Sequence, residues 1–235
     1  VQVVDLLEPT LSVQNVQVSL DEDGNASITT DDAEVSSADN CGIANKSLSL
    51  TDFSCEDLGE VIEVDMTVTD GSGNTHTETF EVTVIEENEP TADPQAYTVA
   101  LDENGLVEFD QSMIDDFIGG NDSDDCSGID ADSRSIAQTQ FSCEDLGENT
   151  VTYSVSDLSG NTGTAPVVIT IVDELAPTAI AQNIVAELDE DGLAVISAAD
   201  ADNGSTDNCS VATRELNITE FSCENLGEQE VTMTV

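Results

Sequence analysis

The chain has 235 residues, of which 51 are acidic and only 3 are basic, so its formal net charge at pH 7 is −48. A surface this acidic repels phosphate backbones and anionic lipid headgroups, which excludes nucleic-acid binding and direct membrane docking unless cations bridge the two surfaces. The sequence also lacks the run of about 18 apolar residues that a membrane-spanning helix needs. Cations and basic surfaces are therefore the expected partners.

Internal repeats organise the whole sequence. The segment Phe-Ser-Cys-Glu-(Asp/Asn)-Leu-Gly-Glu occurs at 53–60, 141–148 and 221–228, and we expect its phenylalanine in the core. Each copy follows a Pro-Thr opening and, 12 residues after that proline, an Asp-Glu-(Asp/Asn)-Gly turn. We predict the end of a preceding repeat at 1–7, repeats at 8–88 and 89–175, and a third repeat at 176–235 that stops before its last strand. Because both ends fall inside expected strands, we expect a longer array.

The apolar residues within each repeat recur with period two, as at Val64, Met66 and Val68, which indicates half-buried strands. Dipeptides such as Asn104-Gly105 tolerate positive φ and predict hairpin turns between such segments. About seven short strands per repeat are typical of an immunoglobulin-like β-sandwich. The expected fold class is therefore all-β, with tandem immunoglobulin-like β-sandwich domains in a linear array.

Six cysteines occur, two in each predicted repeat: Cys41 and Cys55, Cys126 and Cys143, and Cys209 and Cys223. The repetition favours one disulfide within each repeat, which would stabilise it by roughly 3 kcal/mol in the chain-entropy model. A zinc site is the alternative, but each repeat has two cysteines and the chain has a single histidine, His76, whereas zinc takes about four such ligands. Disulfides imply an oxidising, extracellular setting.

Acidic residues concentrate at three loci: the linker between repeats, the segment before the first cysteine, and a late hairpin loop. In a sandwich with alternating strands, all three lie at the same pole. Calcium takes about six to eight oxygen ligands in flexible geometry, so we predict calcium sites at the repeat junctions. The predicted ligands are Asp5, Glu86, Glu87, Asp173 and Glu174 in the linkers; Asp39, Asn40, Asp122, Asp124, Asp125, Asp200, Asp202, Asp207 and Asn208 before the cysteines; and Asp70, Asn74, Asp157 and Asn161 in the loops.

Two other interpretations of the acidic residues stay open. The acidic residues of the Ser/Thr-x-x-Asp segments, Asp32, Asp115 and Asp200, have the spacing of helix caps, which predicts one short helical turn per repeat. Those that open the hairpin turns, such as Asp21, are explained as turn formers. Alternatively, the acidic surface serves solubility or salt adaptation and orders no ion.

The three basic residues occupy one position of the repeat. Lys46, Arg134 and Arg214 each lie nine residues before the second cysteine. This recurrence predicts an internal ion pair, with Glu56, Glu144 or Glu224 as partners. The alternative is an exposed base that is held only by the general field.

Together, the Pro-Thr openings, Leu-Asp-Glu-(Asp/Asn)-Gly turns, Asp-Asn-Cys segments at 39–41 and 207–209, Phe-Ser-Cys strands and Asp-x-Ser-Gly-Asn loops resemble hyalin-repeat (HYR)-like domains. The resemblance covers nearly the whole chain. It implies immunoglobulin-like modules of long, secreted bacterial surface proteins of the Bacteroidetes type, such as gliding-motility adhesins or surface filaments, in which calcium is commonly suspected. The second repeat departs from the pattern, because it has Asp124-Asp125-Cys126 and a longer loop.

These features predict the structural repeat region of an extracellular, cell-surface adhesin or filament, a calcium-stiffened and disulfide-supported stalk. Its partners would be neighbouring repeats and other copies of the chain. The alternatives are a ligand- or carbohydrate-binding module, which the absence of Trp disfavours, and a self-assembling filament subunit. No catalytic residues are expected, because His76 is replaced by Gly163 in the next repeat and no Gly-x-Ser-x-Gly or His-Glu-x-x-His motif occurs.

Overall fold

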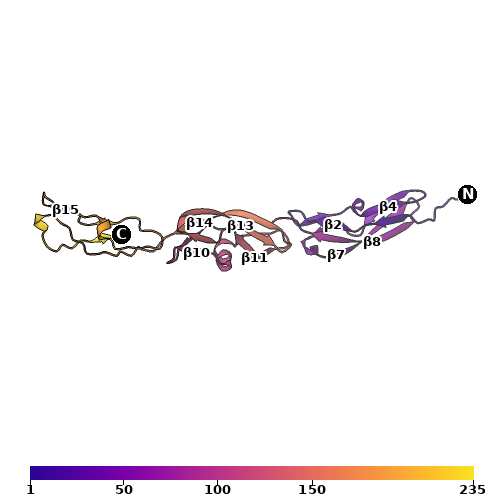
Figure 1. The fold of residues 1–235 in the computed structure, drawn as a ribbon. Helices are drawn as coiled ribbons and strands as arrows, with labels where there is room; N and C mark the ends of the chain where they lie inside the picture. Colours follow the sequence, from indigo (N-terminus) through magenta and orange to yellow (C-terminus); the bar gives the residue numbers. More distant parts are fainter. The chain divides into compact units, whose positions relative to one another are not determined.

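The computed structural model describes residues 1–235 (Figure 1). These residues fall into two compact units. Unit one consists of Val1–Gln95, Ile114–Ile136 and Thr152–Pro166. Unit two consists of Ala96–Met113, Ala137–Val151 and Val167–Val235. No helix in the structure has the length and apolar character that crossing a bilayer requires.

A four-stranded sheet with the order β2-β8-β7-β5 dominates the first repeat in unit one (Figure 1). Strands β7 (Val61–Asp70) and β8 (Thr75–Ile85) form its antiparallel hairpin. Strand β5 (Ile43–Leu48) pairs antiparallel with β7, and β2 (Val16–Ser19) pairs parallel with β8. From Val64 onward every second residue of β7 is buried, which confirms the predicted period of two.

Two-stranded pairs form a second layer over this sheet. They are β1 (Thr10–Val13) with β4 (Glu34–Ala38), and β3 (Asn25–Ser27) with β6 (Asp52–Ser54). Leu11 of β1 and Phe53 of β6 belong to the same buried cluster as Val64 and Val82 of the sheet. The two layers therefore enclose one core, as the predicted β-sandwich requires.

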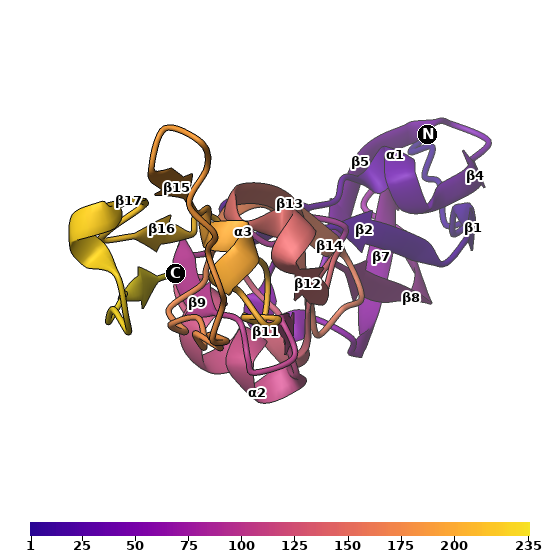
Figure 2. The same cartoon turned by 60° about the vertical axis from the view of Figure 1, so that its left-hand side comes forward.

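The remainder of unit one comes from the second repeat. Strand β11 (Ile129–Ile136) pairs antiparallel with the unit-one part of β13 (Gly147–Asp157), and its register shifts between Asp130 and Ser135. Strand β14 (Thr162–Val172), like β13, contributes residues to both units. The short helical segments of unit one are α1 (Thr30–Ala33), η1 (Cys55–Asp57) and the π-helical η2 (Ile114–Ile118). Figure 2 shows α1 beside β5.

Unit two repeats the same pairings. In its first part, β9 (Tyr97–Ala100) runs parallel to β14 as β2 does to β8, and β10 (Leu106–Glu108) pairs with β12 (Gln140–Ser142) as β3 does with β6. Its remaining strands are β15 (Leu193–Val195) with β17 (Glu220–Ser222), and β16 (Glu215–Leu216) with β18 (Met233–Thr234). Its helical segments are α2 (Gln111–Met113), η3 (Cys143–Asp145), α3 (Ala198–Ala201) and η4 (Cys223–Asn225).

The predicted turns are present, and so are the predicted caps of the first and third repeats. In the second repeat the predicted cap is wrong, because Ser112 lies inside α2 and the Met113 N–H donates to Asp110. At the first turn, the Gly24 N–H donates to the Asp21 carbonyl, and Gly24 has φ of +73°, so a glycine is required there. Helical turns occur at all three predicted places. The backbone N–H of Thr29 donates to the Asp32 carboxylate, and that of Ser197 donates to Asp200. Asp32 and Asp200 therefore cap helical turns, as the alternative interpretation holds.

Candidate cation site

Three segments of unit one meet where β8 ends. Glu86 follows the last residue of β8, Asp124 and Asp125 precede Cys126, and the Asp157–Asn161 loop joins β13 to β14. One carboxylate oxygen from each of Glu86, Asp124 and Asp125 lies within 4.8 Å of the others. The linker, the segment before the cysteine and the late loop therefore converge here, as the sequence predicts.

The late loop holds Glu86 by two hydrogen bonds. The Ser159 hydroxyl donates to Glu86 Oε2 over 2.9 Å, and the Asn161 amide donates to the Glu86 carbonyl over 3.4 Å. The loop's own carboxylate, Asp157, accepts hydrogen bonds from Gly160 and Asn161 and so closes its own loop. The loop therefore positions Glu86 without supplying Asp157 to the cluster.

Burial opposes the ionisation of the carboxyl groups in this cluster. Glu86 is only 6 % exposed, and burial raises the pKa of its carboxyl, with Asp125 and Asp124 adding to the increase. Burial also opposes ionisation of Asp124, but the Gly128 and Cys126 N–H groups donate to that carboxylate and hold its pKa below the ordinary value. Glu86 Oε1 and Asp124 Oδ1 are buried without any hydrogen-bond partner. A divalent cation with hard-oxygen preference would satisfy both atoms.

The corresponding positions of the first repeat form a smaller version of the cluster. Single ligand atoms of Asp5, Asp39 and Cys41 lie within 4.8 Å of one another. The Asn74 amide donates to the Asp5 carbonyl over 3.3 Å, as Asn161 does to Glu86. Asp70, like Asp157, accepts hydrogen bonds within its own loop, from Ser72 and Asn74. Asp5 Oδ2 is buried without a partner, although Asp5 as a whole is half-buried.

The corresponding positions in unit two do not form a third cluster of this kind. Asp173 accepts a hydrogen bond from the Leu175 N–H, and Asp207 is half-buried. Asn208 donates its amide to the Asp102 carbonyl over 3.1 Å, and its Oδ1 atom is buried without a partner. Three further predicted ligands, Asn40, Glu87 and Glu174, are exposed.

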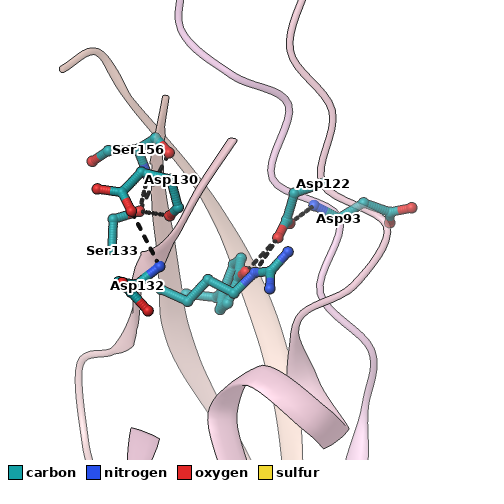
Figure 3. Close-up of polar contacts among 8 residues, drawn as sticks. Asp93, Asp122, Asp130, Asp132, Ser133 and Ser156 are labelled. Atoms are coloured by element: carbon teal, nitrogen blue, oxygen red, sulfur yellow. Dashed lines mark hydrogen bonds and ion pairs between the residues drawn. The ribbon is translucent and has the colours of Figure 1, made fainter. Parts of the chain in front are cut away.

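Asp122 and Asp202 occupy ion pairs with the basic residues. The Asp122 side chain is 0 % exposed and accepts from Arg134 Nε over 2.8 Å, from the Tyr153 hydroxyl over 2.7 Å and from the Asp93 N–H (Figure 3). Arg214 Nε donates to Asp202 over 3.0 Å. Both carboxylates are therefore compensated by a basic side chain of the chain itself.

Figure 3 also shows Asp130, Ser133 and Ser156, which form hydrogen bonds at the register shift of β11.

The predicted internal ion pairs are confirmed, but their predicted partners are wrong. Lys46 pairs with Glu34, so each base pairs with the acid that lies 12 residues before it, and none with Glu56, Glu144 or Glu224. The reason is that the two groups of acidic residues follow different elements of the repeat. Each acid lies just beyond a helical turn, whereas Glu56, Glu144 and Glu224 belong to the 3₁₀ turns that begin at the second cysteine.

The cysteine pairing expected from the sequence is also wrong. The disulfides join Cys55 to Cys126 and Cys143 to Cys209, which are cysteines of successive repeats, and Cys41 and Cys223 are free thiols. Cys41 lies just before β5, at the end of the sheet where Ile43 of β5 pairs with Asp70. Cys55 follows β6 at the other end, where β6 pairs with β3 next to Gly24. The 11 residues of β8 connect those ends and span about 35 Å. A disulfide requires Cα atoms within about 7 Å, so a bond within the repeat cannot form.

No family model matches the chain, and no curated protein matches its sequence. The hyalin-repeat resemblance therefore stays a prediction. Solved structures similar to this chain include protocadherin gamma B7 extracellular cadherin domains 1–4, with 14 % identity and a TM-score of 0.32 over 88 % of this chain and 63 % of that one. Another is the protocadherin gamma B4 extracellular domain, with 16 % identity and a TM-score of 0.35 over 89 % of this chain and 40 % of that one. Mouse cadherin-23 EC22-24 is a third (11 %, 0.36, 89 % and 82 %).

The chain thus spans less than two thirds of the length of the first two of these structures. With TM-scores below 0.5, these similarities carry no weight in assigning a function. The sheets themselves define the class of protein. The chain is an all-β tandem array of immunoglobulin-like β-sandwich domains, cross-linked between successive repeats by disulfides.

Proposed function

We propose that the chain is the structural repeat region of an extracellular adhesin or filament at a bacterial surface, and that calcium bound at its repeat junctions stiffens it. The repeat organisation supports a spacer role, because repeats of such an array contact mainly their neighbours. The disulfides support an oxidising, extracellular location. The bacterial origin rests on the resemblance to hyalin-repeat-like domains alone.

The cluster of Glu86, Asp124 and Asp125 carries the calcium part of the proposal. Three carboxylates share a small volume, no basic residue is among them, and two of their oxygens are buried without a partner. An isolated buried carboxylate is costly unless a cation or a hydrogen bond compensates it. Calcium fits because it accepts irregular sets of oxygen ligands, whereas magnesium demands near-octahedral geometry and keeps its waters.

Stiffening follows from where the ligands originate. Glu86 belongs to the linker that leaves the first repeat, and Asp124 and Asp125 belong to a loop of the second repeat. An ion held by both would resist bending of that linker. It would also neutralise part of the repulsion expected of a chain with a net charge of −48.

Isothermal titration calorimetry with the whole chain tests this proposal. We expect calcium to bind, magnesium to bind far more weakly, and Glu86→Gln to reduce calcium affinity at this site by at least about tenfold, since the variant lacks one charged ligand. Glu87→Gln is the matched control, because it makes the same charge change at the adjacent, exposed residue. Equal affinity in both variants, or no calcium binding by the natural chain, would overturn the proposal.

A further inference from the structure

Two positions of the repeat vary together. One lies two residues before the proline of the Pro-Thr opening, and the other directly precedes the first cysteine. An asparagine occupies one of these two positions in every repeat, but not always the same one. The pairs, with the linker position first, are Leu7 and Asn40 in the first repeat, Asn88 and Asp125 in the second, and Leu175 and Asn208 in the third.

The asparagine amide has an equivalent acceptor at two junctions. Between the first and second repeats, the Asn88 amide donates to the Asp21 carbonyl over 2.9 Å. Between the second and third repeats, the Asn208 amide donates to the Asp102 carbonyl over 3.1 Å. Asp21 and Asp102 open the equivalent turns of their repeats. An asparagine thus ties the turn of one repeat to the next in both cases, from the linker in one junction and from the loop in the other.

The linker asparagine is the one that leaves room for a carboxylate beside the cysteine. An ionised aspartate has no donor, so Asp125 cannot make the bond that Asn208 makes. Asn88 makes this bond instead. It also donates to Asp125 Oδ2 over 2.8 Å, which holds that carboxylate in its cluster with Glu86 and Asp124.

The distance between the loop and the turn differs between the two arrangements. A Cβ placed on Gly24, the glycine of the first turn, would lie 4.0 Å from the Asp125 carbonyl oxygen. One placed on Gly105, the equivalent glycine, would lie 2.8 Å from the Asn208 carbonyl oxygen. The loop therefore approaches the turn more closely where its own asparagine makes the bond.

The two arrangements also differ in the charge that must be compensated. With Asp125, three carboxylates meet, and Glu86 Oε1 and Asp124 Oδ1 are buried without a hydrogen-bond partner. Asn208 Oδ1 is also buried without a partner, but it belongs to a neutral amide. Burial of a carboxylate costs far more than burial of a neutral carbonyl oxygen unless a cation compensates it. Calcium affinity also depends on the number of charged ligands.

We propose that these two positions determine the calcium affinity of each repeat junction. Asparagine in the linker with aspartate before the cysteine gives a junction that calcium completes, and leucine with asparagine gives a junction that the amide closes without calcium. The inference rests on the calcium site proposed above and restricts tight binding to junctions of the first kind. Calcium then stiffens the array locally, at the linker that contains Asn88.

A double-mutant cycle measured in chelator tests the pairing of the two positions. Asn88→Leu should melt about 2–4 °C lower than the natural chain, because the Asp21 carbonyl and the Asp125 carboxylate lose their donor. Adding Asp125→Asn should remove this loss, because the new amide can donate to Asp21 as Asn208 does to Asp102. An equal decrease caused by Asn88→Leu with and without Asp125→Asn would overturn the pairing.

The reverse exchange at the next junction is the matched control. Asn208→Asp should lower the Tm in chelator, because the Asp102 carbonyl loses its donor. Adding Leu175→Asn should restore the Tm, because the linker amide then takes over that carbonyl as Asn88 does at Asp21. A Tm that Leu175→Asn leaves unrestored would overturn the equivalence of the two junctions.

Calorimetry with calcium chloride tests whether the pair sets the affinity. The double variant Asn88→Leu/Asp125→Asn should keep the Tm of the natural chain in chelator but bind calcium at least about tenfold more weakly at the tightest site. Natural affinity in this variant would overturn the proposal. A natural chain that binds no calcium would overturn the function proposed above and the calcium part of this inference with it, whereas the cycle in chelator tests the pairing by itself.

Discussion

The clusters around Glu86 and around Asp5 arise from the same sequence pattern but differ in completeness. Glu86 is 6 % exposed and shares its cluster with Asp125, which precedes the disulfide-bonded Cys126, whereas Asp5 is half-buried and shares its cluster with the free thiol of Cys41. In both, an asparagine of the late loop donates to the carbonyl of the linker acid. The loop and linker are therefore not what distinguishes them.

The preceding repeat makes the difference. At the Glu86 cluster the preceding repeat supplies Cys55, which forms the disulfide with Cys126. The Asn88 amide donates both to the Asp21 carbonyl and to Asp125 Oδ2, and so connects the first turn of the preceding repeat to the next repeat. Burial of the Glu86 and Asp124 carboxylates thus involves residues of two successive repeats.

Removing the disulfide should have the largest effect on this contrast. The Cys55–Cys126 bond joins residues 71 positions apart, and the chain-entropy model assigns such a bond about 4 kcal/mol. We expect the double variant Cys55→Ser/Cys126→Ser to lose about that much unfolding free energy in urea and to bind calcium more weakly. Cys41→Ser, which removes a free thiol, should change stability by less than about 0.5 kcal/mol. Similar losses in both would show that the bond does not hold the junction together.

The buried ion pair should give the next largest effect. Arg134→Met would leave the wholly buried Asp122 without its cation, and breaking such a pair costs about 3 kcal/mol. Lys46→Met is the matched change in the first repeat, where the lysine side chain is 32 % exposed, and it should cost at most about 1 kcal/mol. Urea unfolding of both variants measures the difference. A loss at Lys46 equal to that at Arg134 would contradict the ranking by burial.

The sequence predicts what is local and repeated. Asp21 and Gly24 specify their turn through a carboxylate and a positive φ, and the alternation at Val64 to Val68 specifies a strand with one buried face. The three acidic loci also meet as expected around Asp5 and around Glu86, because alternating strands return the chain to the same end. These features require only the chemistry of neighbouring residues.

Pairings across the repeats could not be predicted in this way. Cys55 and Cys41 are close in sequence, but a strand separates them, and only the register of β5 and β6 reveals that Cys126 is the nearer cysteine. Likewise, nothing at Asp122 itself distinguishes it in the sequence from the other acidic residues, and it is the contact between η2 and β11 that places it beside Arg134. The constant spacing of 12 residues from acid to base was the signal that could have identified those ion pairs.

A thermal melt of the natural chain and of Glu86→Gln, in chelator and then in calcium, tests the central claim most directly. At 100 times its Kd, a ligand adds about 2.7 kcal/mol, so the natural chain should melt about 5–10 °C higher in calcium. Glu86→Gln should melt at least as high as the natural chain in chelator, because it removes a buried charge beside Asp124 and Asp125, and should gain much less from calcium. An equal rise in a monovalent salt of matched ionic strength, or a full calcium response in the variant, would contradict a calcium site at the junction.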